Sequence, residues 1–126
     1  MLENQPVIAF VATQNPPVSR RFYEDLLGLR FVADEPAALI FDAAGTMFRI
    51  QKVEKFTPHP FTAIGWKVTD LHATVAELTK QGVKFEKYEF LSQDDHGIWT
   101  APDGSGVAWF KDPDGNVVSL TAFAQA

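Results

Sequence analysis

The stretch FYEDLLGL at residues 22–29 decides how the first half of this chain folds. Val18, Phe22 and Leu26 recur at the spacing of one helical face. Gly28 then stands where the glycine that follows a helix belongs. Apolar segments that read as strands lie on both sides, so the stretch marks a strand–helix–strand unit.

The second half of the chain repeats this order of elements. Asp70 is a good N-cap residue, and Gly82 ends a second helix whose apolar residues also share one face. The helices are expected at about 17–27 and 70–81. The strands are expected at about 7–13, 29–33, 38–42, 46–53, 62–69, 83–90, 107–111 and 117–123.

Three short segments recur in the same order in both halves, which indicates two copies of one supersecondary unit. The matching pairs are 8–10 with 64–66, 28–31 with 82–85, and 42–50 with 112–120. The last pair contains DPDGN at residues 112–116, a strong turn signal. The fold class is therefore α+β, with two βαβββ modules at 6–55 and 61–123 and an insert at 91–106.

FYEDLLGL and DPDGN, at this separation inside a two-fold repeat, resemble the vicinal-oxygen-chelate superfamily of glyoxalases, bleomycin-resistance proteins and ring-cleaving dioxygenases. The resemblance covers residues 6–123 as a single domain. It implies a homodimer and sheets that curve together into a cup. In catalytic relatives a divalent metal sits in the cup as a Lewis acid. It is held by His or Gln on the first strand of each module and by Glu or a similar residue on the fourth.

Strand alternation separates the side chains that should line the cup from those that should pack under a helix. On each strand the bulkier apolar set is expected under a helix, and the smaller or more polar set in the cup. The helix-facing residues are then Ile8, Phe10, Phe48, Ile50, Ile64, Trp66, Val68, Val118 and Leu120.

The metal-ligand positions implied by the resemblance hold no suitable donors. They fall on Val7 (with Ile8 as its neighbour) and Arg49 in the first module, and on Ala63 and Ser119 in the second. Hydrocarbon side chains cannot bind a metal, arginine is a permanent cation, and a serine hydroxyl is a weak ligand. The sequence therefore predicts no bound metal and no cofactor.

Three histidines remain as candidate ligands. His59 lies in a Pro-His-Pro linker, and His72 in the first turn of the second helix. His96 follows Asp94 and Asp95, so these residues form either a polar turn or an alternative metal site. The 91–106 insert that carries them could also fold over the cup as a lid, with Trp99 reaching inward.

Arg49 is the most informative residue, because a guanidinium on the inner face of a sheet must be paired. Either it forms a structural ion pair with Asp42 or Glu86, or it anchors a carboxylate, phosphate or carbonyl group of a ligand. Flat aromatic walls and a few polar anchors are typical of ligand pockets. The predicted ligand-binding residues are Arg49, Gln51, Lys67, Tyr88, Trp99, Trp109 and Ser119.

The net charge of −5 argues against nucleic acid as a partner, because phosphate binding depends on clustered Lys and Arg. No signal peptide or membrane span is visible, and the absence of cysteine fits a reducing compartment, so a cytoplasmic protein is expected.

The first hypothesis for function is metal-independent binding of a small organic molecule, as in bleomycin-resistance proteins. The second is a metal-free lyase or isomerase using Arg49 and an acid such as Glu86. The third is a metal-dependent glyoxalase-like lyase or dioxygenase with ligands relocated around His96.

Overall fold

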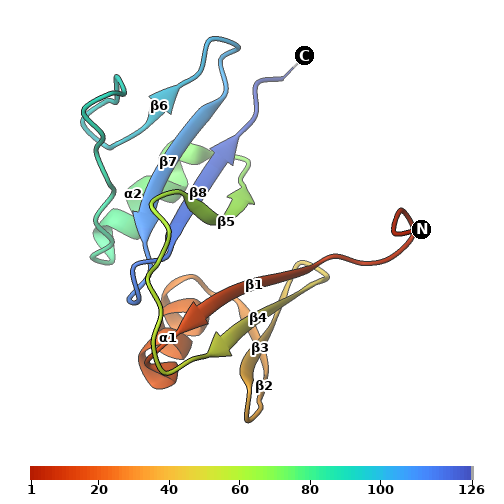
Figure 1. Ribbon diagram of the computed structural model, residues 1–126. Coiled ribbons are helices and arrows are strands. Elements are labelled where there is room, and N and C mark those ends of the chain that lie inside the picture. Colours follow the sequence, from red (N-terminus) through yellow and green to blue (C-terminus); the bar gives the residue numbers. More distant parts are fainter. Residues whose placement is uncertain (126) are drawn as a thin grey trace. The chain divides into compact units, whose positions relative to one another are not determined.

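Two four-stranded sheets with the same strand order make up the structure, a computed structural model that describes residues 1–125 (Figure 1). The orders are β1-β4-β3-β2 and β5-β8-β7-β6, and each sheet combines one parallel pair with antiparallel pairs. The first sheet belongs to the unit Met1–Pro58 and the second to the unit that begins at His59. The α+β class and the repeated βαβββ order are confirmed. None of the described helices is long and apolar enough to span a membrane.

The helix predicted in the first unit forms, but its second half is wound differently. Regular α1 gives way to a wider π-helical turn, η1, in which the N–H of Leu27 donates to the carbonyl of Phe22 at 3.0 Å. Gly28 follows with a φ of 72°, the left-handed conformation that glycine adopts without strain. The elements are β1 (Ile8–Thr13), α1 (Pro16–Arg21), η1 (Phe22–Leu26), β2 (Arg30–Asp34), β3 (Ala38–Ala43) and β4 (Thr46–Lys52).

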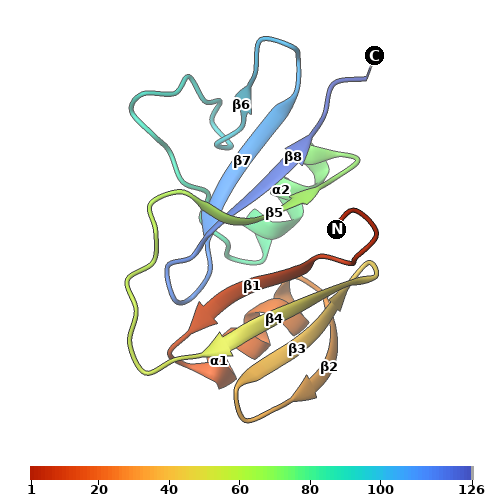
Figure 2. The same ribbon diagram turned by 45° about the vertical axis from the view of Figure 1, so that its right-hand side comes forward.

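The helical segment lies against one face of the first sheet (Figure 2). Aromatic rings fill the space between the two. Tyr23 is fully buried, with its ring centroid 6.3 Å from that of Phe41 and 5.2 Å from that of Phe48. Tilted and edge-on ring pairs at such separations are favourable beyond the area they bury. The helix-facing positions predicted for β4, Phe48 and Ile50, are fully buried as expected.

The face assignment of β1 was wrong. Ile8 and Phe10 were expected under the helix, but they are 46% and 52% exposed, and Val11 is buried instead. The parallel register sets Phe10 opposite Arg49, and residues paired in this way point to the same face of a sheet. Large aromatic rings already fill the space under the helix, so the smaller side chains of β1 pack there. We call the face of each sheet opposite its helix the helix-free face.

The second unit forms its helix as predicted. α2 begins after Asp70, whose carboxylate accepts the N–H of Ala73 at 3.0 Å. Leu71, Val75 and Leu78 are its buried residues, and the helix contacts β7 and β8. The elements are β5 (Thr62–Lys67), α2 (Leu71–Lys80), β6 (Trp99–Thr100), β7 (Gly106–Lys111) and β8 (Val117–Ala122).

The strand predicted at 83–90 is wrong. This segment makes a single bridge, Phe85 to Phe110, and the fourth strand of the sheet is the short β6 within the insert. The N–H of Glu86 still donates to Trp109 at 2.8 Å, but the N–H of Tyr88 donates to the side chain of Gln93 at 2.7 Å. A side-chain acceptor thus replaces a strand partner, and the alternating pattern of this segment could not reveal that.

A bulge in β5 explains why the first strands of the two modules align differently in the structure and in the sequence. In β5 the register shifts between Thr62 and Ile64. The step from Thr62 to Ile64 covers two residues, while the step between their partners in β8 covers one. Beyond the bulge, Gly65 lies opposite Ser119, as Phe10 lies opposite Arg49 in the first unit. The sequence match of 8–10 with 64–66 is therefore displaced by one residue relative to the structure.

The DPDGN turn before β8 is closed by one buried carboxylate. Asp112 accepts the N–H groups of Asp114 and Asn116, each at 2.9 Å, and the side-chain amide of Asn116 at 2.8 Å. Asp112 and Asn116 are both buried. Aspartate in such turns takes up backbone donors that would otherwise lose water without a partner.

Replacing Asp112 by alanine should lower the free energy of unfolding by about 2–4 kcal/mol, because two buried donors of Asn116 and the part-buried N–H of Asp114 lose their acceptor together. Urea denaturation measures the change. Asp95→Ala is the matched control, since Asp95 is an exposed aspartate in another turn of the same unit. Equal stabilities of the two variants would contradict this role of Asp112.

Candidate functional site

A small cavity lies on the helix-free face of the first sheet. Its volume is about 170 Å³, and its lining residues come from β1, β4, the first residue of β3 and the turn before it. They are Phe10, Ala37, Ala38, Arg49 and Gln51. Two predicted ligand-binding residues, Arg49 and Gln51, therefore share one cavity, and Phe10 joins them because of the β1 register.

Arg49 has few partners for its charge. Its side chain is 27% exposed, and one guanidinium nitrogen lies 3.6 Å from a carboxylate oxygen of Glu35. A second nitrogen makes a weak contact with the sulfur of Met47 at 3.9 Å. Within the described part of the chain, the charged group of Arg49 makes these two contacts. A guanidinium carries five N–H donors, so most of its donors are not used by the protein.

Within the first unit, the ionic partner of Arg49 is Glu35 and not Asp42, the partner that the sequence suggested there. Asp42 lies 3.9 Å from Arg30, and Glu86 lies 3.5 Å from Lys111, within the second unit. Glu35 was missed because it stands in the turn between β2 and β3, where alternation along a strand gives no direction.

The turn that carries Glu35 is fixed to β4. The N–H of Lys52 donates to Ala37, and the N–H of Glu35 donates to Ala38, both at 2.9 Å. The ammonium of Lys52 also pairs with the carboxylate of Asp34. These contacts hold the turn in place beside the cavity independently of the Glu35 side chain.

The second unit carries an aromatic group of four residues. The ring centroid of Trp109 lies 5.6 Å from that of Tyr88 and 6.4 Å from that of Trp99. Phe90 continues the row at 5.5 Å from Tyr88 and is largely exposed. Three predicted ligand-binding residues, Tyr88, Trp99 and Trp109, are thus brought together, and Trp99 belongs to β6.

Gln93 holds the segment that carries Tyr88. Its side-chain oxygen accepts the N–H of Tyr88, and its nitrogen donates to the carbonyls of Glu86 and Gly97 at 3.0 and 2.7 Å. Burial, with a smaller contribution from the charge of Glu86, raises the pKa of the Tyr88 hydroxyl. No pattern in the sequence indicates this role of Gln93, apart from its place in the insert.

Lys67 and Ser119 share the helix-free face of the second sheet. Lys67 pairs with Thr121, and Ser119 pairs with both Gly65 and Trp109. A Cβ at position 65 would lie 2.5 Å from the hydroxyl oxygen of Ser119, so this side chain occupies the space above the glycine. Ser119 is buried and fills a gap, while Lys67 is exposed.

The His96 cluster forms a turn. The carboxylate of Asp94 accepts the N–H groups of His96 and Ile98, each at 2.9 Å, and lies 4.0 Å from the imidazole of His72. Slight burial opposes a fall in the pKa of Asp94, but these N–H groups and the two nearby imidazoles bring it below its usual value. Among residues 1–125, no three His, Asp or Glu side chains are grouped so that they could hold a metal ion.

The metal-ligand positions do not fit a metal after the strand registers are corrected. On the helix-free face of the first sheet, β1 presents Ile8 and Phe10 beside Arg49. On the second, Gly65 lies opposite Ser119. Hydrocarbon, a guanidinium and one hydroxyl supply no set of strong donors.

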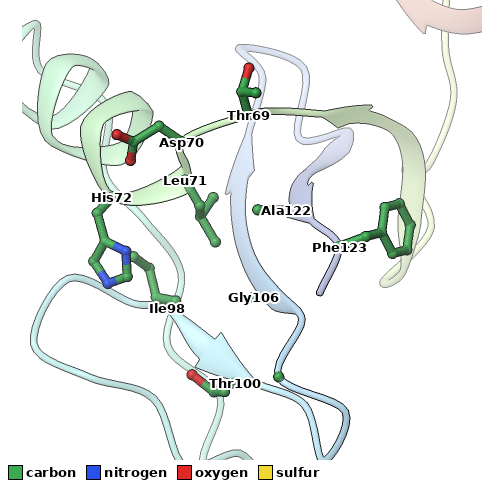
Figure 3. A pocket seen from close by; sticks show the side chains of 10 residues that line it. Thr69, Asp70, Leu71, His72, Ile98, Thr100, Gly106, Ala122 and Phe123 are labelled. Atoms are coloured by element: carbon green, nitrogen blue, oxygen red, sulfur yellow. The ribbon is translucent and has the colours of Figure 1, made fainter. Parts of the chain in front are cut away.

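A larger crevice, of about 350 Å³, lies beside the start of α2, and sequence reasoning missed it (Figure 3). Figure 3 shows Asp70, Leu71 and His72 at the start of α2, with Thr100 across the crevice on β6. Asp70 already caps the helix, and the side chain of His72 is mostly exposed. This crevice lies outside the predicted set of ligand-binding residues.

The comparisons with known proteins agree with the fold. Residues 6–120 match the family model of the Glyoxalase/Bleomycin resistance protein/Dioxygenase superfamily. A search of curated proteins gives no match.

Among solved structures, a lactoylglutathione lyase from Agrobacterium tumefaciens is similar, with a TM-score of 0.72 and 15% identity over 94% of this chain and 93% of that one. The fosfomycin resistance protein FosX from Listeria monocytogenes has a TM-score of 0.74 and 12% identity, covering 94% and 92%. A superfamily member from Sphaerobacter thermophilus has a TM-score of 0.71 and 22% identity, covering 93% and 97%.

Replacing Gln93 by glutamate should loosen the aromatic group and lower the free energy of unfolding by about 1–3 kcal/mol, because a carboxylate cannot donate to two carbonyls. Near-ultraviolet circular dichroism reports the aromatic packing, and urea denaturation reports the stability. Gln5→Glu, the same change at an exposed position in the first unit, is the control. An aromatic signal that matches the control would rule out this role for Gln93.

Proposed function

The chain belongs to the Glyoxalase/Bleomycin resistance protein/Dioxygenase superfamily, and from that premise we propose that it binds a small organic molecule without a metal ion. The cavity at Arg49 is the proposed binding site. The ligand carries an oxygen-bearing or anionic group that contacts the guanidinium, and its apolar body rests on Phe10. The structural relatives lie below 25% identity, so the proposal draws on them for the fold alone.

One observation carries this proposal: the guanidinium of Arg49 has unused donors and faces a cavity. Its side chain is mostly buried, yet its one ionic partner lies at 3.6 Å, beyond the 2.7–2.9 Å of a charge-assisted hydrogen bond. A guanidinium removed from water without good partners is unfavourable. A ligand oxygen in the cavity would complete its hydrogen bonding.

Metal independence is supported by donor chemistry. Phe10 and Gly65 take first-strand positions on the helix-free faces, and neither has a side chain that can bind a metal. Arg49 would also repel a cation. Oxygen groups of a ligand are therefore expected to meet N–H donors of the protein instead of a Lewis acid.

The other predicted ligand-binding residues lie in the second unit. Lys67, Tyr88, Trp99 and Trp109 offer a cation and flat apolar surfaces within that unit, and they are proposed as ligand contacts of the second unit by itself. The homodimer and the cytoplasmic location expected from the sequence also remain proposals.

A metal-free lyase or isomerase is the alternative, and one contact favours it. Glu35 sets a carboxylate beside Arg49 and is 51% exposed, so it could accept a proton from a ligand held by the guanidinium. Glu86, the acid suggested by the sequence, pairs with Lys111 within the second unit. Conversion of a bound ligand, lost in Glu35→Gln, would favour the enzyme over the binding protein.

Replacing Arg49 by alanine should weaken binding about ten- to a hundredfold, because removing a charge-assisted hydrogen bond costs about 1.5–3 kcal/mol. A ligand found by thermal-shift screening of small oxygen-bearing molecules serves for calorimetric titration. The melting temperature should change little, since the carboxylate left behind on Glu35 is half exposed. A large fall in melting temperature with unchanged affinity would make Arg49 structural and move the site elsewhere.

Removing divalent metals should leave the affinity for the same ligand unchanged. Untagged protein is dialysed against a chelator and titrated before and after zinc, nickel, iron or manganese is restored. Loss of binding on chelation and its recovery with one metal would contradict the proposed metal independence.

A further inference from the structure

We infer that the Arg49 cavity takes a small monocarboxylate, and that Glu35 is the internal carboxylate which this ligand displaces. The inference rests on the proposed function, because it specifies the ligand and the regulation of the same site. Glu35 lies at the guanidinium that a ligand oxygen would use, so protein and ligand compete for one cation.

The contact between Arg49 and Glu35 is suited to displacement. The 3.6 Å separation is a loose ion pair, and the Glu35 side chain is 51% exposed. The loss of such a pair changes an equilibrium constant by about fivefold or less. A ligand carboxylate that approaches the planar guanidinium in a bidentate geometry makes shorter and stronger hydrogen bonds. Glu35 can meanwhile turn into water.

The size and lining of the cavity favour a carboxylate over a phosphate group. Its volume of about 170 Å³ is below the range usual for drug-sized ligands. Arg49 is the one cation among its lining residues, and nearby Lys52 is neutralised by Asp34. A single planar charge therefore matches the site better than a phosphate dianion. Phe10 would contact the apolar body, and the amide of Gln51 can donate to a ligand oxygen.

The turn beside the cavity allows the Glu35 side chain to be changed without unfolding. Its shape depends on the backbone bonds of Lys52 to Ala37 and of Glu35 to Ala38, and on the Asp34–Lys52 pair. Glu35→Gln keeps the size of the side chain and the backbone bond and removes only the charge. The competing interaction can thus be weakened selectively.

The test is a calorimetric titration of the whole 126-residue chain with benzoate, and with benzamide as its uncharged counterpart. Glu35→Gln should bind benzoate about two- to fivefold more tightly than the unchanged protein, the gain expected from losing a weak ion pair. Asp25→Asn is the matched control, because it removes one charge from an exposed residue of η1 on the helix side of the same sheet. It should leave the affinity within about the error of the titration at physiological salt, where distant surface charges are screened.

Two further measurements complete the test. Arg49→Met should weaken benzoate binding about tenfold or more, and melting temperatures of all variants verify folding. The affinity for benzamide should be the same for Glu35→Gln and for the unchanged protein, because benzamide carries no charge that competes with Glu35.

The outcomes separate the inference from the proposed function. If benzoate binding depends on Arg49 but Glu35→Gln matches Asp25→Asn, displacement is wrong while the proposed site stands. If Glu35→Gln binds more weakly, Glu35 positions Arg49 and does not compete for it. If benzoate binds to none of the variants, the carboxylate is wrong, and the proposed function then depends on ligands found by screening. If Arg49→Met binds as tightly as the unchanged protein, both proposals fail.

Discussion

The parallel pairing of β1 with β4 is the constraint on which the candidate site depends. It sets Phe10 opposite Arg49 and Val11 opposite Ile50, and a shift of one residue would exchange the two faces. Because Tyr23 and Phe48 fill the space under the helix, β1 presents its small side chains there. The aromatic ring of Phe10 is left beside the guanidinium, and a cavity with one charged and one apolar wall results.

The second unit uses the same frame for different chemistry. The pair equivalent to Phe10 and Arg49 is Gly65 and Ser119, in which the serine side chain fills the space that the glycine leaves. Its aromatic group arises from the insert, where Gln93 binds three backbone groups and β6 adds a short edge to the sheet. The buried Asp112 turn stabilises the frame, and the residues on the helix-free face are free to differ between the copies.

Much of the fold could be predicted because local chemistry determines it. Asp70 caps α2 and Gly28 ends the first helical segment as their residue types indicate. The placement of Arg49 and Gln51 away from the helix also followed from alternation along β4. The strand expected at 83–90 did not form, because the partner of Tyr88 is a glutamine side chain in an irregular segment. The alternation of apolar and polar residues in a segment does not indicate whether its backbone will bind a strand or a side chain.

The sequence by itself determined the α+β class, the two repeated modules, the helix ends and the absence of strong metal donors at the expected positions, since each depends on residue type and short-range spacing. Tertiary structure alone decided which face of β1 meets the helix, which residue of β5 forms the bulge, and that Glu35 is the partner of Arg49. These features depend on register between strands distant in sequence and on the volume left by packed rings. A one-residue change in register alters every contact on a face while leaving the periodic pattern of the sequence unchanged.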